Sequence, residues 1–239
     1  MKIALIGYGK MGKAIEELAI SRGHEISHRI SSSNPFHQVD LLDADVAIEF
    51  TRPELAVDHI HCCVNQNVPI VVGTTAWQNK LSEVTDFVNS KNGGMLHASN
   101  FSVGVNIFFE LNKILARLMS NQTEYRIEAE EIHHVQKLDA PSGTAVSLMS
   151  DIIAANDHYT DWQLVSDMNE AKEYNIPVIA KREPGISGTH EISYLSEIDT
   201  LSIKHVAHSR KGFAMGAVLA AEFLQGKSGV YSMSDVLKI

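Results

Sequence analysis

The sequence predicts an α/β fold in which a doubly wound parallel sheet is interrupted by a second, α+β domain with a mixed or antiparallel sheet. Over residues 1–100, short apolar runs typical of buried strands alternate with stretches of helical periodicity. Strand-rich segments follow, and residues 213–224 then form a helix that is apolar almost all round. Such a helix is best buried against the first sheet, so the chain returns to its first domain. The predicted domains are 1–100 plus 210–239, and 101–209.

A glycine-rich motif lies directly after the first predicted strand, residues 3–6. The pattern G-x-G-x-x-G opens a helix that ends near Ser21. The first glycine permits a tight turn, the second lets the backbone approach a pyrophosphate, and the third lets helix and strand pack closely. A turn without a ligand is the alternative. We expect a Rossmann-type dinucleotide site formed by Gly7, Tyr8, Gly9, Lys10, Met11 and Gly12.

The cofactor preference depends on the end of the second predicted strand, residues 25–30. A site selective for NAD usually places an acid there, about 20 residues beyond the glycines, on the ribose 2′-hydroxyl. This chain has Ser31 and Ser32 instead, with Arg29 just before them. No carboxylate would repel a 2′-phosphate, and hydroxyl groups can hydrogen-bond to one. The sequence therefore favours NADPH, or the use of both cofactors, and leaves NADH open.

Three predicted loops meet at one edge of the parallel sheet. Further strands are predicted at 46–50, 70–72 and 95–98, with helices at 53–65 and 78–89 between them. In such sheets, ligands lie beyond the carboxyl ends of the strands. The candidate cofactor residues at these ends, besides the glycine-rich loop, are Gly73, Thr74 and Thr75, and Ala98, Ser99, Asn100 and Phe101.

The pattern changes after residue 100. Residues 125–133, 189–195 and 201–207 alternate between apolar and polar side chains, as half-buried strands do. Residues 151–174 are polar and irregular, and no element is predicted there. A helix is predicted over 105–119, with one apolar face formed by Ile107, Phe108, Leu111, Ile114, Leu115 and Leu118.

Candidate catalytic side chains concentrate in residues 130–145, which hold His133, His134 and Lys137 just before a predicted helix. Ser142 or Thr144 can cap that helix. A helix start presents unpaired backbone N–H groups and the positive end of the helix dipole, so it favours an anion. Cationic groups and proton donors beside such a position suit a carboxylated substrate that must receive a proton. A strand that runs into a capped helix, with its histidines satisfied locally, is the alternative.

Composition excludes several classes of protein. The net charge of −9 argues against nucleic acid as the main partner, because phosphates need a basic patch. No stretch is long enough to span a membrane, and the first apolar run is too short for a signal peptide. Cys62 and Cys63 are adjacent and read as buried thiols of an apolar helix, which fits a cytoplasmic protein. No metal site is expected, because adjacent histidines on a strand point to opposite faces and no H-E-x-x-H motif supports them.

Nearly the whole chain resembles the dihydrodipicolinate reductases, also described as 4-hydroxy-tetrahydrodipicolinate reductases, of bacterial lysine and diaminopimelate biosynthesis. The most specific match is E-I-H-H, followed by Lys137 and by D-A-P-S-G-T-A at residues 139–145. Other matches are the glycine-rich loop, E-F-T-R-P at 49–53, G-T-T at 73–75, A-S-N-F-S-V-G-V-N at 98–106 and G-T-H at 188–190. The resemblance implies NAD(P)H-dependent reduction of a cyclic imine that bears two carboxylates.

The resemblance also implies roles for individual residues. His133 is a proton donor or acceptor, Lys137 is the donor that completes the reduction, and His134, Gly143 and Thr144 hold the carboxylates of the substrate. Ser142, beside Gly143, is a further candidate for substrate binding. The three loops named above line the cofactor, and the family is usually a homotetramer built through the sheets of the second domain. Ser31 departs from the family, which usually has an acid there; Glu49 replaces the usual aspartate, and Ala76 a glycine.

Two other functions stay open at this point. One is a different NAD(P)-dependent two-domain dehydrogenase of amino-acid biosynthesis, such as an aspartate-semialdehyde or homoserine enzyme. The aspartate-semialdehyde reaction needs a nucleophilic cysteine in the second domain, whereas both cysteines here lie in the first. The other is a dinucleotide sensor without turnover, which has no need for His133, His134 and Lys137 beside an anion position.

Overall fold

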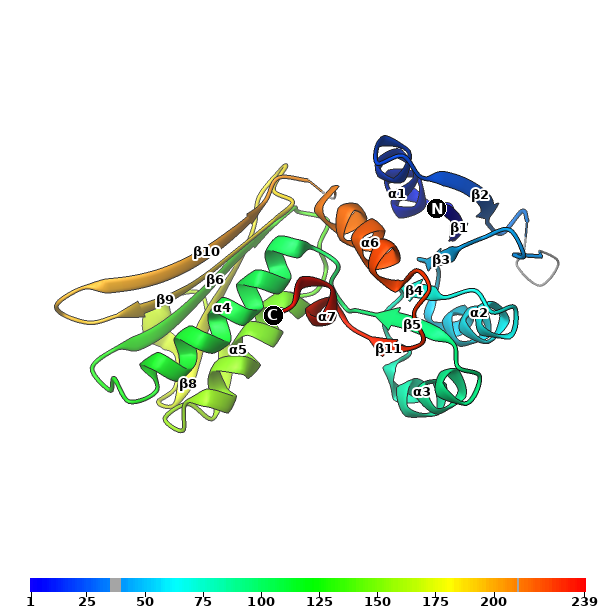
Figure 1. Cartoon of the computed structure of the whole chain (residues 1–239). Coiled ribbons are helices and arrows are strands. Elements are labelled where there is room, and N and C mark those ends of the chain that lie inside the picture. The colour runs from blue at the N-terminus through cyan, green and yellow to red at the C-terminus, as the bar shows by residue number, and fades with distance from the viewer. Residues whose placement is uncertain (35–39, 210) are drawn as a thin grey trace. The chain divides into compact units, whose positions relative to one another are not determined.

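The chain forms two compact units in the computed structural model, which describes residues 1–34, 40–209 and 211–239 (Figure 1). Unit 1 comprises Met1–Val103 and Lys211–Ile239, and unit 2 comprises Gly104–Arg210. Residue 210, the predicted start of the returning segment, lies outside the described residues. The predicted fold class, a parallel sheet in one part and a mixed sheet in the other, is confirmed.

Unit 1 is built on a six-stranded parallel sheet with the order β11-β5-β4-β3-β1-β2. The chain moves outward from β1 to β2 on one side and from β3 onward to the other. The topological switch point, where α/β folds bind ligands, therefore lies between β1 and β3. The strands are β1 (Lys2–Ile6), β2 (Glu25–Ile30), β3 (Val46–Glu49), β4 (Ile70–Val72), β5 (Gly94–His97) and β11 (Gly229–Tyr231).

Helices cover both faces of this sheet, as a parallel sheet requires. Ile3 and Leu5 of β1 pack in the core that contains α1, α6 and α7, whereas Ala4 and Ile6 pack in the core that contains α2 and α3. Helix α3 begins later than predicted, because a 3₁₀ turn (Gln78–Lys80) precedes it, and neither β11 nor α7 was predicted. The helices are α1 (Lys10–Ser21), α2 (Pro53–Asn65), α3 (Leu81–Ser90), α6 (Lys211–Leu224) and α7 (Met233–Leu237).

Unit 2 is built on a five-stranded mixed sheet with the order β10-β9-β6-β8-β7. The β10–β9 and β9–β6 pairs are antiparallel, and the β6–β8 and β8–β7 pairs are parallel. Helices α4 (Val103–Met119) and α5 (Gly143–Ala155) pack on one face (Figure 1). The strands are β6 (Arg126–His133), β7 (Asp161–Leu164), β8 (Asn175–Arg182), β9 (Gly188–Leu195) and β10 (Thr200–Ala207).

The region left unassigned from the sequence contains ordered elements. Helix α5 continues to Ala155, β7 follows, and a 3₁₀ turn spans Met168–Glu170. Strand β8, which was not predicted, lies beside β6 in the sheet. Pro177 within β8 breaks the sequence signature of a strand, since proline cannot donate to a sheet ladder.

The predicted apolar face of α4 was right for Phe108 and Leu115, which pack in the core of unit 2, and wrong for its other four residues. The helix turns Phe108, Asn112 and Ala116 toward the core, and Asn112 Nδ2 donates a hydrogen bond to the Leu148 carbonyl at 2.9 Å. Because the polar Asn112 occupies a core position, the apolar periodicity of the sequence did not indicate the face that is buried. In the described part of the chain, four predicted core residues instead form an exposed stripe: Ile107 (43%), Leu111 (49%), Ile114 (41%) and Leu118 (68%). None of the helices described has the length and apolar character needed to cross a membrane.

Candidate functional site

The three glycines of the first loop have different surroundings. Gly7 has a φ of +101°, and a Cβ atom added there would lie 2.0 Å from the Phe50 carbonyl oxygen. At Gly12 an added Cβ would lie 2.3 Å from the Gly7 carbonyl oxygen, whereas at Gly9 it would meet no heavy atom within 4 Å. Gly7 and Gly12 are therefore required by the packing of the loop, and Gly9 leaves open space above the backbone. Helix α1 starts at this point without a side-chain cap among the described residues.

Two adjoining cavities lie beyond the carboxyl ends of β1, β3 and β4, and Gly9 and Thr51 line both of them. The larger, of about 830 Å³, is lined by Gly7, Tyr8, Ser31 and Ser32 among others. The smaller, of about 390 Å³, brings together Lys10, Met11 and Gly12 from the first loop with Gly73, Thr74 and Thr75 from the loop after β4. Most of the cofactor residues expected from the sequence thus share one surface at the switch point.

The loop after β5 is the exception, because residues 98–101 are absent from the described lining of both cavities. Phe101 is buried, and its ring lies 5.6 Å from the ring of Phe50. The Asn100 side chain accepts a hydrogen bond from the Ser102 backbone N–H at 2.9 Å. These contacts give the loop a structural role in unit 1, and Ala98 and Ser99 follow β5 directly.

A buried carboxylate supports the loops around the smaller cavity. Glu49, the last residue of β3, is fully buried and accepts hydrogen bonds from the hydroxyl groups of Thr51 and Thr74, the latter at 2.9 Å. The Thr74 hydroxyl in turn accepts from the Thr51 backbone N–H at 2.7 Å, and Trp77 Nε1 donates to the Thr74 carbonyl at 2.7 Å. Glu49 therefore joins the loop after β3 to the loop after β4.

The charge at the end of β2 is already paired. Arg29 Nε donates to a Glu16 oxygen at 2.9 Å, and the Tyr8 hydroxyl donates to the same carboxylate. Ser31 and Ser33 hydroxyl groups lie 2.8 Å apart. Arg29 is consequently neutralised by an acid from α1. Ser31 and Ser32 line the larger cavity, and its other polar lining residues include Arg52, Asp58 and His59.

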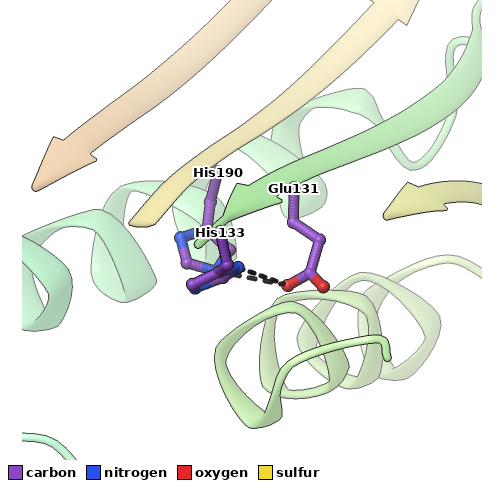
Figure 2. A group of neighbouring side chains, drawn as sticks. All are labelled: Glu131, His133 and His190. Carbon is purple, nitrogen blue, oxygen red and sulfur yellow. Dashed lines mark ion pairs between the residues drawn. The ribbon is translucent and has the colours of Figure 1, made fainter. Parts of the chain in front are cut away.

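The candidate catalytic side chains gather at the end of β6 in unit 2. Figure 2 shows Glu131 and His133 on β6 with His190 from the neighbouring β9. One Glu131 oxygen, Oε2, lies 3.4 Å from His133 Nδ1 and 3.7 Å from His190 Nε2. Glu131 is fully buried, and His133 and His190 are 8% and 6% exposed. Residues 131 and 133 share a face because side chains alternate along a strand.

The surroundings of the two imidazoles favour their neutral forms. Burial lowers the pKa of His133; Glu131 opposes this change, and the positive charges of Lys137 and Arg182 add to it. Burial, together with His133, His205 and Lys137, lowers the pKa of His190 to about 3. His190 is therefore neutral at physiological pH, and its Nε2 lies 3.0 Å from the Ser142 hydroxyl.

Ser142 is the residue that caps α5, where the sequence left Ser142 and Thr144 as alternatives. Its hydroxyl accepts a hydrogen bond from the Ala145 backbone N–H at 3.2 Å, and its own backbone N–H donates to Glu131 Oε2 at 3.0 Å. Gly143 and Thr144 form the first turn of the helix. A Cβ added at Gly143 would meet nothing within 4 Å, so the start of this helix is open.

Lys137 lies on the loop between β6 and α5, and His134 lies at the start of that loop. The Lys137 Nζ donates to both carboxylate oxygens of Asp139 at 2.8 Å, which holds the pKa of Asp139 below its usual range. Arg182, at the end of β8, donates to the carbonyl oxygens of Lys137 (3.3 Å) and Asp139 (2.6 Å) and to Glu131 Oε1 (3.2 Å). The lysine-bearing loop is thereby attached to the buried cluster.

The ligand-type atoms of Glu131, His133 and His190 all lie within 4.8 Å of one another, a spacing that a divalent metal ion can span. Two features oppose this use. The Glu131 carboxylate already accepts hydrogen bonds from the Ser142 backbone and from Arg182, and Arg182 and Lys137 add positive charge beside the cluster. The positive charges of Arg182 and Lys137 repel a metal cation and attract an anion. The cluster is better suited to an acidic ligand.

Sequence reasoning missed three residues of this site, Glu131, Arg182 and the role of His190. Arg182 and His190 come from β8 and β9, which reach β6 only through sheet pairing. Glu131 was detectable, because it lies two residues before His133 on a predicted strand and so shares its face.

Comparison with known proteins covers both units. A family model described as dihydrodipicolinate reductase, N-terminus, matches residues 1–101, and one described as dihydrodipicolinate reductase, C-terminus, matches residues 104–237. A 4-hydroxy-tetrahydrodipicolinate reductase of Christiangramia forsetii is 44% identical over 237 residues, which cover 99% of this chain and 98% of the relative. A Staphylococcus aureus protein of the same name is 35% identical, covering 99% and 100% of the two chains.

Two solved structures show the same fold. A dipicolinate-bound dihydrodipicolinate reductase from Paenisporosarcina sp. TG-14 superposes with a TM-score of 0.80 at 22% identity, covering 97% of each chain. An amine dehydrogenase from Mycobacterium smegmatis superposes with a TM-score of 0.60 at 9% identity, covering 98% of this chain and 95% of the other. At these identities the likeness concerns the fold alone.

Proposed function

The chain belongs to the dihydrodipicolinate reductase family, and we propose that it catalyses the NAD(P)H-dependent reduction of 4-hydroxy-tetrahydrodipicolinate to tetrahydrodipicolinate in lysine and diaminopimelate biosynthesis. The observation that carries this proposal is the gathering of His133, Lys137 and the open start of α5 around one buried cluster. Family membership sets aside the other dehydrogenases and the sensor without turnover. In this proposal unit 1 (predicted as 1–100 plus 210–239) binds the dinucleotide, and unit 2 (101–209) binds the substrate.

The substrate is a dicarboxylate, and the charges of unit 2 suit it. The open first turn of α5, with Gly143 and Thr144, offers backbone N–H groups to one carboxylate. Ser142 fixes this turn, and His134 lies on the adjoining loop. Lys137 and Arg182 supply positive charge that attracts the anion. The Paenisporosarcina reductase has dipicolinate bound, and a dicarboxylate ligand in that relative agrees with this class of substrate.

Proton transfer is the part of the reaction that falls to Lys137 and His133. Lys137 donates a proton to the ring carbon beside the one that receives the hydride. In the free protein its Nζ is paired with Asp139, and pairing with a substrate carboxylate instead would bring Nζ to the ring. His133 is neutral in the free site because burial lowers its pKa. Two substrate carboxylates would raise that pKa, since a nearby negative charge favours the protonated imidazole. His133 therefore takes up and returns a proton beside Lys137.

The residues of unit 1 fit a dinucleotide. The open space above Gly9 and the uncapped start of α1 suit a pyrophosphate, and the larger cavity suits an adenosine ribose beside Ser31 and Ser32. Gly73, Thr74 and Thr75 line the smaller cavity, where we place the nicotinamide end. The loop at 98–101 follows β5, the strand next to β4 in the sheet, so we assign it to the same end of the cofactor. The bound NAD(P)H supplies the hydride.

NADPH is slightly favoured over NADH, because hydroxyl groups and no carboxylate stand at positions 31 and 32. Ser31→Asp tests this preference, since a carboxylate there would repel a 2′-phosphate. We expect the variant to lose roughly tenfold in affinity for NADPH and little for NADH. Equal losses for both cofactors would contradict the assignment of this end of the cavity.

A homotetramer is the proposed assembly, and the cytoplasm the proposed location. The exposed apolar stripe of α4 (Ile107, Leu111, Ile114 and Leu118) is the kind of surface that a subunit contact covers. Cys62 and Cys63 are both free thiols, as expected in a reducing compartment. Light scattering of the purified protein measures the assembly, and Leu111→Glu is expected to reduce its mass if the stripe is an interface.

The decisive experiment supplies the substrate directly. The condensation product of pyruvate and aspartate semialdehyde is mixed with the protein, and loss of NADH or NADPH absorbance is followed in separate reactions. We expect substrate-dependent loss with at least one cofactor. No loss with either cofactor, in protein that binds both, would refute the reductase proposal.

A further inference from the structure

Glu131 occupies a position where a charged group is costly. It lies on the core face of β6 and is fully buried. A buried carboxylate destabilises a protein unless hydrogen bonds and opposite charges compensate for its lost hydration. The contacts that compensate it come from other segments, so their identity shows what the carboxylate holds in place.

Those contacts come from three segments that carry candidate site residues: the end of β6, the start of α5 and the end of β8. Oε2 accepts a hydrogen bond from the Ser142 backbone at the start of α5 (3.0 Å) and lies near His133 Nδ1 (3.4 Å). Oε1 accepts from Arg182 Nη2 (3.2 Å). The same guanidinium donates to the carbonyl oxygens of Lys137 and Asp139 (3.3 and 2.6 Å). The proposed proton carrier, the carboxylate-binding helix start and the lysine loop therefore share one anchor.

We propose that the Glu131–Arg182 pair is the positioning element of the reductase site, which fixes His133, the first turn of α5 and the Lys137 loop in one arrangement. This inference rests on the proposed function. Neither residue needs to touch the substrate, because each acts through a group assigned to proton transfer or to carboxylate binding. The orientation of the carboxylate toward His133 and His190 is visible in Figure 2.

The two residues act as a unit because each satisfies the other. Without Arg182, Glu131 would keep a buried negative charge with one oxygen unpaired; without Glu131, Arg182 would lose its only carboxylate among the described contacts. Removal of one partner of a buried pair costs more than the pair itself contributes. Effects of the two single substitutions are therefore expected not to add.

Glu131→Gln is the test, because it keeps the shape of the side chain and removes its charge. Glu130→Gln is the matched control. Glu130 directly precedes Glu131 on β6, lies on the opposite face of the strand and pairs with Lys181. We expect Glu131→Gln to lower kcat/KM by roughly 10- to 100-fold, as misplaced catalytic groups do. Cofactor affinity in unit 1 stays unchanged, and Glu130→Gln stays within about twofold of the wild type.

A pH measurement separates positioning from a general loss of structure. The groups that face His133 are Glu131, Lys137, Arg182, His134 and His190. Glu131 is the one negative charge among these named groups, so its removal lowers the pKa of His133. NMR of labelled histidines is expected to show this decrease in Glu131→Gln and not in Glu130→Gln. This readout needs no turnover, so it stands even if the wild type proves inactive on the proposed substrate.

A double-mutant cycle completes the design. Arg182→Gln is expected to lower kcat/KM as well, and Glu131→Gln with Arg182→Gln is expected to cost less than the product of the two single effects. If Glu131→Gln does not fold, Arg182→Gln decides, because its side chain is 21% exposed and its loss should still slow turnover at least tenfold. Wild-type rates in folded Glu131→Gln or in Arg182→Gln, or strictly multiplicative effects, would overturn the proposal. An inactive wild type would instead refute the function.

Discussion

The loops around the cavities of unit 1 are shaped by glycines and by threonine hydroxyl groups that donate to the buried Glu49, whereas in unit 2 the buried Glu131 lies beside the candidate proton carrier His133 itself. Gly7 and Gly12 are needed because an added Cβ atom would collide with a backbone carbonyl oxygen, at 2.0 Å and 2.3 Å respectively. Glu131 is held instead by hydrogen bonds and opposite charges from β8 and from the start of α5.

The difference follows from the task proposed for each unit. A dinucleotide is bound along an extended surface, where close approach of the backbone matters and no group of the protein changes charge. A proton donor has to change its charge during each turnover, so its neighbours must set its pKa. We therefore expect substitutions of the glycines in unit 1 to act through shape and substitutions around His133 in unit 2 to act through charge.

The largest effect is expected from Lys137→Ala. Loss of the proposed proton donor should lower kcat by about 10²–10⁴-fold, the range typical of general acid catalysis, while cofactor affinity stays unchanged. Steady-state kinetics and a cofactor titration measure the two quantities. Lys181→Ala, which removes a lysine paired with Glu130 on the opposite face of the sheet, is the control. Turnover near that of the wild type in Lys137→Ala would remove this residue from the mechanism.

Gly12→Ala and Gly9→Ala form a matched pair in unit 1. The added methyl group collides at Gly12 and meets open space at Gly9, so Gly12→Ala should lose about 1–3 kcal/mol of stability and Gly9→Ala almost none. Gly9→Ala should instead weaken cofactor binding by roughly tenfold. Trp77 in unit 1 and Trp162 in unit 2 allow separate fluorescence melts if the other tryptophan is replaced by phenylalanine. Equal melting temperatures for both glycine variants would show that the close packing at Gly12 is not required.

Acid should weaken unit 2 through His190. Burial and its neighbours lower the pKa of His190 to about 3 in the folded protein, against about 6.5 in an unfolded chain. Below pH 6.5 the unfolded state binds this proton and the folded state does not. The contribution of neutral His190 to the free energy of unfolding is therefore fully present above pH 6.5 and is lost as the pH falls toward 3. The loss is about 2 kcal/mol by pH 5. In His190→Gln, a melt followed by Trp162 should show a shallower decrease over this range, and an unchanged slope would contradict the assignment.

The smallest effect is expected at an exposed ion pair of unit 1. Arg22 donates to both oxygens of Glu222 at 2.8 Å and holds the pKa of that carboxyl below its usual range. A lowered carboxyl pKa stabilises the fold above the unfolded value of about 4.3, and this contribution disappears as the pH falls through the folded value. Because the pair is solvated, Glu222→Gln should cost under about 1 kcal/mol at pH 7 and less at pH 3. Denaturant unfolding of the wild type and the variant at the two pH values measures this loss of stability. A larger loss at pH 3 than at pH 7 would contradict the prediction.

The sequence predicted unit 1 more completely than unit 2, for a physical reason. In unit 1 each candidate cofactor loop directly follows its own strand, so local patterns such as the glycine motif and G-T-T at 73–75 locate the loops. In unit 2 the site is assembled by sheet pairing, which brings Arg182 and His190 to β6 from distant positions. Local periodicity carries no information about such pairing, and at α4 it was misleading because Asn112 occupies a core position.

The order of elements along the chain has a consequence for synthesis on the ribosome. Helix α6 supplies Ala214, Ala217 and Val218 to one core of unit 1, and β11 pairs with β5, yet both are made after all of unit 2. Unit 2 is continuous in sequence, so all of its core residues are synthesised before unit 1 is complete. Until residues 211–239 emerge, the nascent sheet of unit 1 has one apolar face covered only by α1 and an open edge at β5, so chains stalled in that interval are the ones most open to chaperone contact and degradation.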